Sequence, residues 1–210
     1  MENKLIYEFS SHKTDGEASL SNLLGGKGAN LAEMSKLGIE VPPGFTITTE
    51  VCNYFSHNNH LPEGLKEEIV NSVRNLESYS NKNFGEGKSP LLLSVRSGGM
   101  ISMPGMMDSI LNIGVNDENV GYLAEAFSDE RFALDSYRRL IQMYSNVVLG
   151  VDHERFEAVI ANKKRMDDVV SDADFNVDQL NWIISAYKNT VERFTDSEFP
   201  QDPYEQLLGA

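Results

Sequence analysis

The sequence contains one cysteine, one tryptophan and far fewer basic than acidic residues. Its 210 residues include 32 Asp and Glu against 18 Lys and Arg, which gives a formal net charge of -14. Because an acidic surface repels polyanions and no Lys/Arg cluster offsets it, this composition argues against nucleic-acid and anionic-membrane partners. Cys52 alone cannot form an internal disulfide, and no apolar run reaches the roughly 18 to 20 residues that cross a bilayer. The polar start also lacks the apolar segment of a signal peptide, so we expect a cytoplasmic protein.

The first half of the chain has the pattern of a mixed sheet and helix layer. With 40% hydrophobic residues the chain can bury a core. Short β-rich pieces occur at 5–9, 45–49, 91–95 and 110–113, and residues 62–78 keep helical apolar spacing. We therefore predict an α+β fold in which residues 1–114 form a mixed α/β subdomain.

Beyond Gly114 the pattern changes to helical spacing. One stripe runs through residues 134–148 and ends at Gly150, a second short one runs through 156–160, and a third runs through 180–194. Asn116 and Asp117 are plausible helix N-caps ahead of them. Residues 115–210 are thus predicted to be a mostly helical subdomain, whose tyrosine and aliphatic stripes are read as core.

An arginine stands at the base of a glycine-rich loop. Residues 91–95 are apolar apart from Ser94, which predicts a strand buried on both faces, and Arg96 follows at its end. Residues 97–108 include three glycines before the apolar run resumes at 110–113. A guanidinium on a rigid strand offers bidentate donors for phosphate. The same arginine could instead only pair with a carboxylate at a sheet edge, and the local pattern leaves both possibilities open.

A second basic residue lies in the glycine-rich turn Gly25-Gly26-Lys27-Gly28, just before a helical pattern that Gly38 ends. Unpaired N–H groups and the positive dipole end at a helix start favour anions, and Lys27 adds a point charge. The turn is not a Walker A loop, because Ser21 and Gly28 stand where that motif requires glycine and Ser or Thr. Glycines before a helix are also common structural punctuation, so the local pattern does not decide between the two readings.

No metal ligands are predicted. His57 and His60 lie in a polar stretch with no cysteine or acidic residue between them, and histidines in that setting are usually solvated.

Several long motifs resemble one known family. The sequence resembles the N-terminal, ATP-grasp-like nucleotide-binding domain of the pyruvate phosphate dikinase family over essentially all 210 residues. The motifs, in chain order, are NLLGGKGANLAEM at 22–34, VPPGFTITTE at 41–50, LLLSVRSG and SMPGMMDSILNIG between 91 and 114, RFALDSYRRLIQMYSNVV at 131–148 and FPQDPYEQLLGA at 199–210. The related pyruvate, water dikinases share the glycine-lysine and Ser-Val-Arg-Ser elements but not the SMPGMMD loop or the SYRR helix in this form.

The resemblance implies a phosphotransferase. Enzymes of this family interconvert ATP, inorganic phosphate and pyruvate with AMP, pyrophosphate and phosphoenolpyruvate. They use Mg²⁺, a monovalent cation and a phosphorylated histidine on a swivelling central domain, and the full enzyme is expected to be a homodimer. The resemblance places the Mg²⁺ ligands, the adenine contacts, the phosphohistidine and the pyruvate site beyond Ala210, so the segment alone is expected to be inactive.

The resemblance also assigns site residues. Lys27 and Arg96 match the family's phosphate-binding lysine and arginine, and both are expected to serve catalysis by neutralising the triphosphate. Gly105, Met106 and Met107 are expected to lie in a loop over the phosphates. Met100 stands where the family usually has a second arginine, which puts that contact in doubt. Two alternatives remain: a pyruvate, water dikinase domain, or a non-catalytic nucleotide-binding module.

Overall fold

A computed structural model describes residues 4–97 and 109–210 of the chain. The described residues fall into two compact units. The first comprises 4–81 with 96–97, and the second comprises 82–95 with 109–210. Both units combine helices with short strands, so the predicted α+β class is confirmed. The predicted subdomain division at residue 114 stays a prediction.

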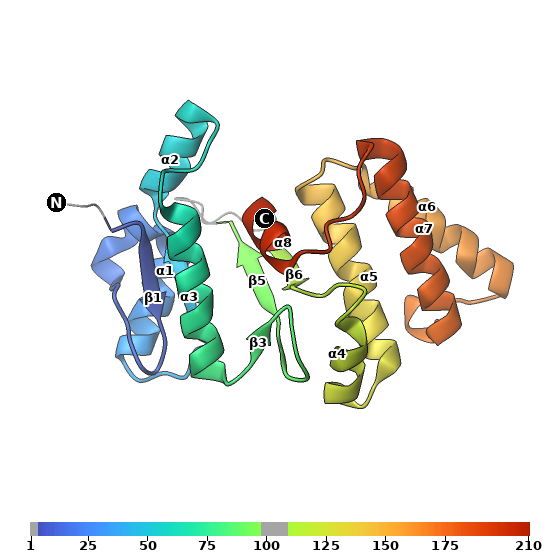
Figure 1. The fold of residues 1–210 in the computed structure, drawn as a ribbon, viewed down its shortest axis with the longest axis horizontal. Helices are drawn as coiled ribbons and strands as arrows, with labels where there is room; N and C mark the ends of the chain where they lie inside the picture. Colours follow the sequence, from blue (N-terminus) through green and yellow to red (C-terminus); the bar gives the residue numbers. More distant parts are fainter. Residues whose placement is uncertain (1–3, 98–108) are drawn as a thin grey trace. The chain divides into compact units, whose positions relative to one another are not determined.

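The first unit is built around a two-stranded antiparallel sheet (Figure 1). In its register Ile6 lies opposite Ile47 and Phe9 opposite Gly44. Helices α1 and α3 both contact β1. The elements are β1 (Ile6–Phe9), a 3-10 turn (Ala18–Leu20), α1 (Ser21–Lys36), β2 (Gly44–Ile47), α2 (Thr49–Asn58) and α3 (Leu65–Ser80).

Helix α3 follows the predicted apolar spacing. Leu65, Ile69, Val73 and Leu76 are each at most 5% exposed, and these four side chains lie on one helical face. The structured helix begins three residues later than predicted because Gly64 at the N-cap takes a left-handed conformation with φ 80°. The helix ends at Ser80, and its C-cap Asn81 is also left-handed.

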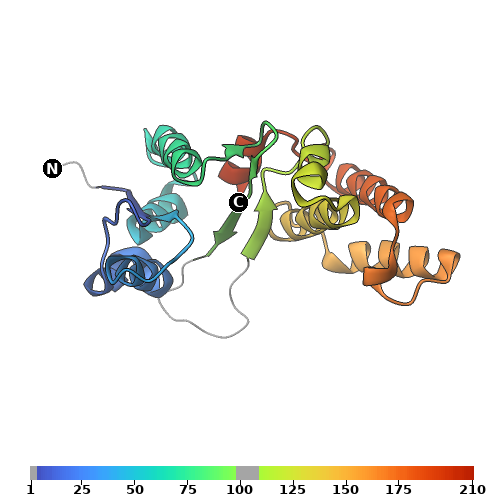
Figure 2. The same ribbon diagram turned by 90° about the horizontal axis from the view of Figure 1, so that it is seen from below.

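Among the described residues the strands form three separate two-stranded sheets rather than one layer. Beside β1–β2 they are β3 (Asn83–Phe84) with β4 (Pro90–Leu91), and β5 (Leu93–Arg96) with β6 (Ser109–Ile113). The prediction of one strand over 91–95 buried on both faces was wrong. Leu92 belongs to neither β4 nor β5, so the strand is interrupted there. The side chains of β5 alternate between half-buried and exposed. Figure 2 shows β5 and β6 side by side, and a two-stranded sheet lacks the neighbours and the two helical layers that would bury both faces.

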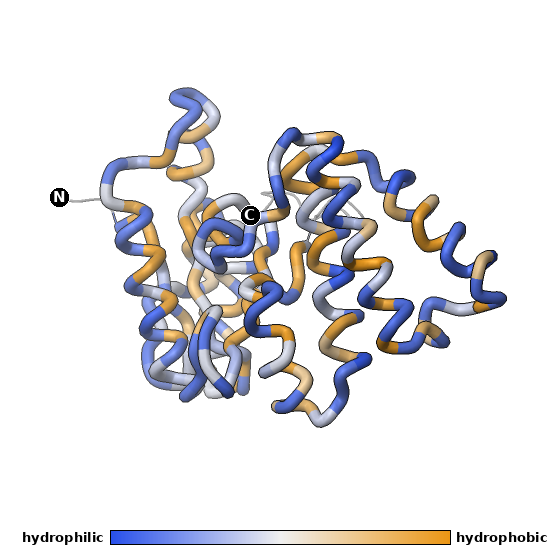
Figure 3. The backbone as a smooth tube through the Cα atoms, turned by 45° about the vertical axis from the view of Figure 1, so that its right-hand side comes forward, coloured by the Kyte–Doolittle hydropathy of each residue, from blue (hydrophilic) through white to orange (hydrophobic). Residues whose placement is uncertain are grey.

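The second unit has α5 (Glu130–Val147) at its centre. This helix contacts α4 (Val120–Phe127), α7 (Val177–Thr195) and β6, and Figure 1 shows α5 and α7 side by side. The predicted stripe is confirmed: Leu134, Tyr137, Ile141 and Tyr144 are at most 6% exposed. Figure 3 shows hydrophobic and hydrophilic residues alternating along these helices, as expected for helices with one buried face.

Side-chain caps set several helix starts. Asp129 accepts the N–H of Phe132 at the start of α5, and Asn176 and Gln179 form a reciprocal capping box at the start of α7. The predicted short helix around Phe156 is α6 (His153–Asp167). It is longer than the apolar spacing indicated, because its last turns are mostly polar. The prediction of Asn116 and Asp117 as N-caps was wrong: α4 begins at Val120, and its N-cap is Asn119.

The end of the chain packs on the corner that follows β6. Helix α8 (Pro203–Gly209) carries Gln206, which is fully buried. Its side chain accepts the N–H of Gly114 at 2.9 Å and donates to the carbonyls of Val115 at 3.0 Å and Pro200 at 2.9 Å. One side chain thereby satisfies three backbone groups that would otherwise be unpaired in the interior.

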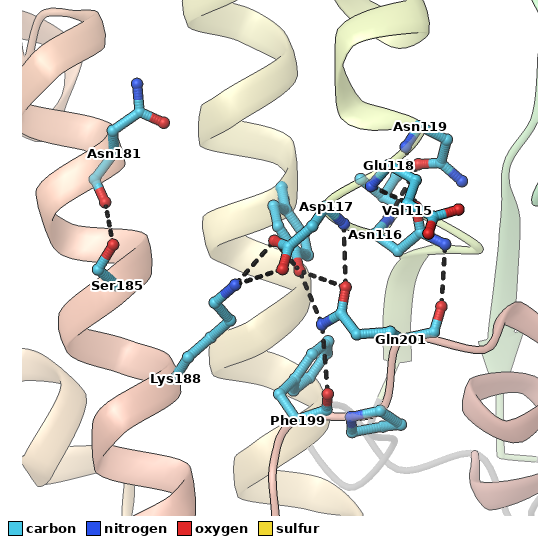
Figure 4. Close-up of polar contacts among 12 residues, drawn as sticks. Val115, Asn116, Asp117, Glu118, Asn119, Asn181, Ser185, Lys188, Phe199 and Gln201 are labelled. Carbon is cyan, nitrogen blue, oxygen red and sulfur yellow. Dashed lines mark hydrogen bonds and ion pairs between the residues drawn. The ribbon is translucent and has the colours of Figure 1, made fainter.

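A second network ties the same corner to α7 (Figure 4). Lys188 Nζ lies 2.6 Å from Asp117 Oδ2, and the Tyr137 hydroxyl donates to Asp117 Oδ1 at 3.0 Å. The Asp117 N–H donates to Gln201 Oε1 at 3.0 Å, and Asn116 Nδ2 donates to the Gln201 carbonyl at 2.9 Å. Segments about 70 to 85 residues apart in the sequence are therefore held together by polar contacts.

We predict that Gln206→Ala destabilises the chain by about 2–4 kcal/mol, because it leaves two or more buried backbone groups unpaired. Urea denaturation followed by circular dichroism measures the change. The matched control is Glu205→Ala on the exposed face of the same helix, which should shift stability by less than about 0.5 kcal/mol. Equal stability of the two variants would contradict the assigned role of Gln206.

Candidate functional site

The predicted glycine-rich turn lies inside α1, where the helix is broken. Gly25 has φ 67° and ψ 164°, so one helical turn ends at Leu24 and the helix resumes after Gly25. A positive φ of this kind is strained for residues with a side chain, which explains the glycine. The start of a helix leaves its first N–H groups without acceptors in the helix itself. The prediction of a glycine turn that opens a helix is therefore confirmed.

Lys27 is exposed on this turn. Its neighbours Gly28 and Ala29 are buried, so the turn presents the lysine outward while the backbone beside it packs inward. Within the described residues, Lys27 makes no ion pair or side-chain hydrogen bond. Lys66 on α3 is also exposed and without such a partner, so the glycine turn is what distinguishes Lys27.

Arg96 is the last residue of β5 and is exposed. Among the described residues no carboxylate pairs with it, so the sheet-edge ion pair that the sequence left open does not appear in this part of the chain. Gly105, Met106, Met107 and Met100 lie outside the described residues. The convergence of Lys27 and Arg96 on one ligand stays a prediction.

Three other cations of the first unit are held by carboxylates. Lys4 lies 2.8 Å from Asp15 and Lys13 lies 3.4 Å from Glu8, while Lys36 lies 3.0 Å from Glu17 at the surface. Glu8 is only 8% exposed and also accepts a 2.7 Å hydrogen bond from Asn75. Sequence reasoning missed this cluster, because a single glutamate in a short strand gives no sign that it is buried.

Neither of two hollows among the described residues is lined by Lys27 or Arg96. One, of about 210 Å³, lies beside the Glu8 cluster, and one, of about 460 Å³, lies between α4 and the start of α5.

The described residues hold no group of three or more His, Cys, Asp or Glu that could bind a metal ion. His57 and His60 are exposed, and one ring nitrogen of each contacts a backbone carbonyl. No helix in residues 4–97 or 109–210 is long and apolar enough to cross a membrane.

Comparison with known proteins gives the family. Residues 21–83 match the family described as pyruvate phosphate dikinase, AMP/ATP-binding domain, and this range contains Lys27 but ends before Arg96. The chain is 48% identical over 208 residues to the pyruvate, phosphate dikinase of Rickettsia conorii and 47% identical over 208 residues to that of Rhizobium meliloti. It is 45% identical over 205 residues to the chloroplastic enzyme of Mesembryanthemum crystallinum.

These alignments include 97–99% of this chain but only 22–24% of each relative. The matched region is similar to the AMP/ATP-binding domain of that family. The chain belongs to the pyruvate phosphate dikinase family, which confirms the resemblance, and it spans about a quarter of the length of the relatives it matches.

The Glu8 cluster predicts a specific pH dependence. Burial favours the neutral form of Asp15, but its bonds to Lys4 and to the Glu8 N–H outweigh burial and lower the pKa of Asp15 below the usual 3.8. A lowered folded-state pKa adds stability that is complete above about pH 5 and is lost as the pH falls through the folded-state pKa. Urea denaturation should therefore show a larger loss between about pH 5 and pH 3 for the parent than for Asp15→Asn. Parallel curves for the two proteins would contradict this account.

Proposed function

We propose that this chain is the ATP-binding part of a longer pyruvate phosphate dikinase. Such an enzyme converts ATP, pyruvate and phosphate to AMP, phosphoenolpyruvate and pyrophosphate, with a phosphohistidine on a domain outside this chain as the carrier. The observation that carries the proposal is the 45–48% identity to enzymes of that name over nearly the whole chain. The match of residues 21–83 to an AMP/ATP-binding domain supports the nucleotide as the ligand.

In this proposal Lys27 and Arg96 bind the polyphosphate. Phosphoryl transfer needs little covalent chemistry from the protein, so its catalysts mainly position the nucleotide and neutralise charge. An exposed ammonium at a helix opening and an exposed guanidinium at a strand end suit that task, because each can reach a ligand without first breaking an ion pair to a described residue. Gly105, Met106 and Met107 are proposed to contact the phosphates as well.

Mg²⁺ is proposed to accompany the nucleotide, with protein ligands outside this chain. The described residues do not fit a metal site of their own, since no cluster of three potential ligands occurs among them. Mg²⁺ bound with nucleotides is commonly held by one or two carboxylates together with phosphate oxygens. This chain is therefore proposed to bind the phosphates and not to supply the metal ligands. The proposed cellular setting is the cytoplasm, and the proposed assembly is a homodimer.

The assigned roles predict a selective loss. In the full-length protein, Lys27→Ala and Arg96→Ala should each slow phosphorylation of the enzyme by ATP and phosphate by about 100-fold, the scale of removing one charge-stabilising donor. Phosphoryl exchange between phosphoenolpyruvate and pyruvate should stay unchanged, because neither side chain is assigned to that half-reaction. Rapid-quench kinetics of each half-reaction measures the effect.

The matched control is Lys66→Ala, which removes an exposed lysine of the same unit that also lacks an ion pair to a described residue. It should leave both half-reactions unchanged. Equal loss of both half-reactions in the Lys27 or Arg96 variant would point to misfolding and contradict the assigned role.

A second prediction concerns the 210-residue chain alone. Two charge-assisted contacts supply about 3–6 kcal/mol, which corresponds to a Kd between several millimolar and about 40 µM. The adenine contacts and metal ligands that would tighten binding are proposed to lie elsewhere. Isothermal titration calorimetry with Mg-ATP should therefore detect weak binding or none, and a Kd of about 1 µM would contradict the proposal.

A further inference from the structure

The turn that carries Lys27 is held on both sides by one neighbouring segment. Upstream of the break at Gly25, the Thr49 hydroxyl donates to the carbonyl of Asn22 at 2.9 Å. Downstream of it, Gly28 lies against Thr46. Thr46 and Thr49 lie only three residues apart, at the junction of β2 and α2. Lys27 thus stands between two anchor points that come from the same short stretch.

The downstream anchor is steric. A Cβ added at Gly28 would lie 2.7 Å from both Thr46 Cγ2 and Thr46 Oγ1, and 3.2 Å from Thr46 Cβ. Carbon atoms at van der Waals contact are about 3.5–4.0 Å apart, so α1 can approach β2 this closely only with glycine at position 28. A Cβ at Gly26, by contrast, would meet nothing within 4 Å. The requirement at Gly28 is therefore a close approach to β2, which the sequence alone does not reveal.

The upstream anchor is polar. Asn22 lies in the single helical turn before the break, and its carbonyl bonds to the first residue of α2. The turn before the break is also fixed by Leu24, which is 3% exposed. Because Gly25 interrupts the helix, the two parts of α1 could rotate independently if each were not fixed from outside.

The anchoring segment is itself well held. Thr46 lies opposite Tyr7 in the β1–β2 register, and the Thr48 N–H donates to the Leu5 carbonyl at 3.0 Å. The positions of Thr46 and Thr49 are therefore set by the sheet and not by the turn that they hold.

We infer that Thr46, Thr49 and Gly28 are positioning residues for the ammonium group of Lys27. They fix the backbone on each side of the break, and this fixes where the exposed lysine projects. The inference rests on the proposed function of Lys27 and goes beyond it, since it says what sets the geometry of that contact. A displacement of ~1 Å at a reacting group can reduce the rate ~100-fold, so such supports have measurable effects.

The first test uses Thr49 in the full-length protein. Thr49→Val keeps the side-chain shape and removes the donor, and it should slow phosphorylation by ATP roughly 3- to 10-fold, the scale of one hydrogen bond. Exchange between phosphoenolpyruvate and pyruvate should not change. Thr49→Ser keeps the hydroxyl and should restore the rate. If Thr49→Val lowers the melting temperature but leaves the ATP rate intact, the contact is only structural and the inference is wrong.

A double-mutant cycle shows whether Thr49 acts through Lys27. With Lys27 already replaced by alanine, Thr49→Val should cause no further loss of the ATP half-reaction, because the group that it positions is gone. Equal losses in both backgrounds would overturn the inference. If Lys27→Ala itself has no effect, the proposed function of Lys27 fails. If Lys27→Ala slows the reaction and Thr49→Val does not, only the positioning role fails.

The second test relieves the steric contact. Gly28→Ala should slow phosphorylation by ATP by about tenfold or more, because the added methyl group moves α1 away from β2. Adding Thr46→Ala removes the two atoms at 2.7 Å and should recover most of the rate. Thr46→Ala alone is the reference for this comparison. A double variant as slow as Gly28→Ala, or a Gly28→Ala variant as fast as the parent, would contradict the inference.

Discussion

Close packing without a side chain at Gly28 is the constraint on which the first unit depends. Helix α1 meets the Thr46 side chain so closely that even a methyl group would clash, and Ala29 and Ala32 continue the buried face with 1% and 2% exposure. A helix pressed onto a strand through small residues keeps its opposite face exposed. The exposure of Lys27 therefore follows from the close contact between α1 and β2 at Gly28.

The second unit depends more on buried polar groups. Gln206 satisfies two backbone groups at the corner after β6 and one ahead of α8, and Asp117 joins the same corner to Lys188 on α7. Arg138 on α5 is 3% exposed and lies 2.8 Å from Asp135. Burial alone would lower the pKa of Arg138, but the carboxylate of Asp135 outweighs burial and raises it, so the guanidinium stays charged in the interior. Such groups fix one arrangement of the helices, because any other would leave them unpaired.

The sequence was informative where periodicity and glycine carry the signal. The stripe on α5, the apolar face of α3 and the glycine turn before Lys27 were all predicted, since each depends on residues close together in the chain. The strand over 91–95 was predicted wrongly, because an apolar run does not tell how many neighbours a strand will have. The buried roles of Glu8 and Gln206 were missed because their partners Asn75 and Gly114 come from distant segments. The buried role of Arg138 was missed because arginine is rarely buried. The phosphate roles of Lys27 and Arg96 came from family resemblance and not from the local pattern.

A structure of the full-length protein with a non-hydrolysable ATP analogue tests the central claim most directly. The account predicts that Lys27 Nζ and the Arg96 guanidinium both lie within about 3 Å of oxygens of the same polyphosphate, the distance of a charge-assisted hydrogen bond. A nucleotide whose phosphates contact neither side chain, or only one of them, would contradict it.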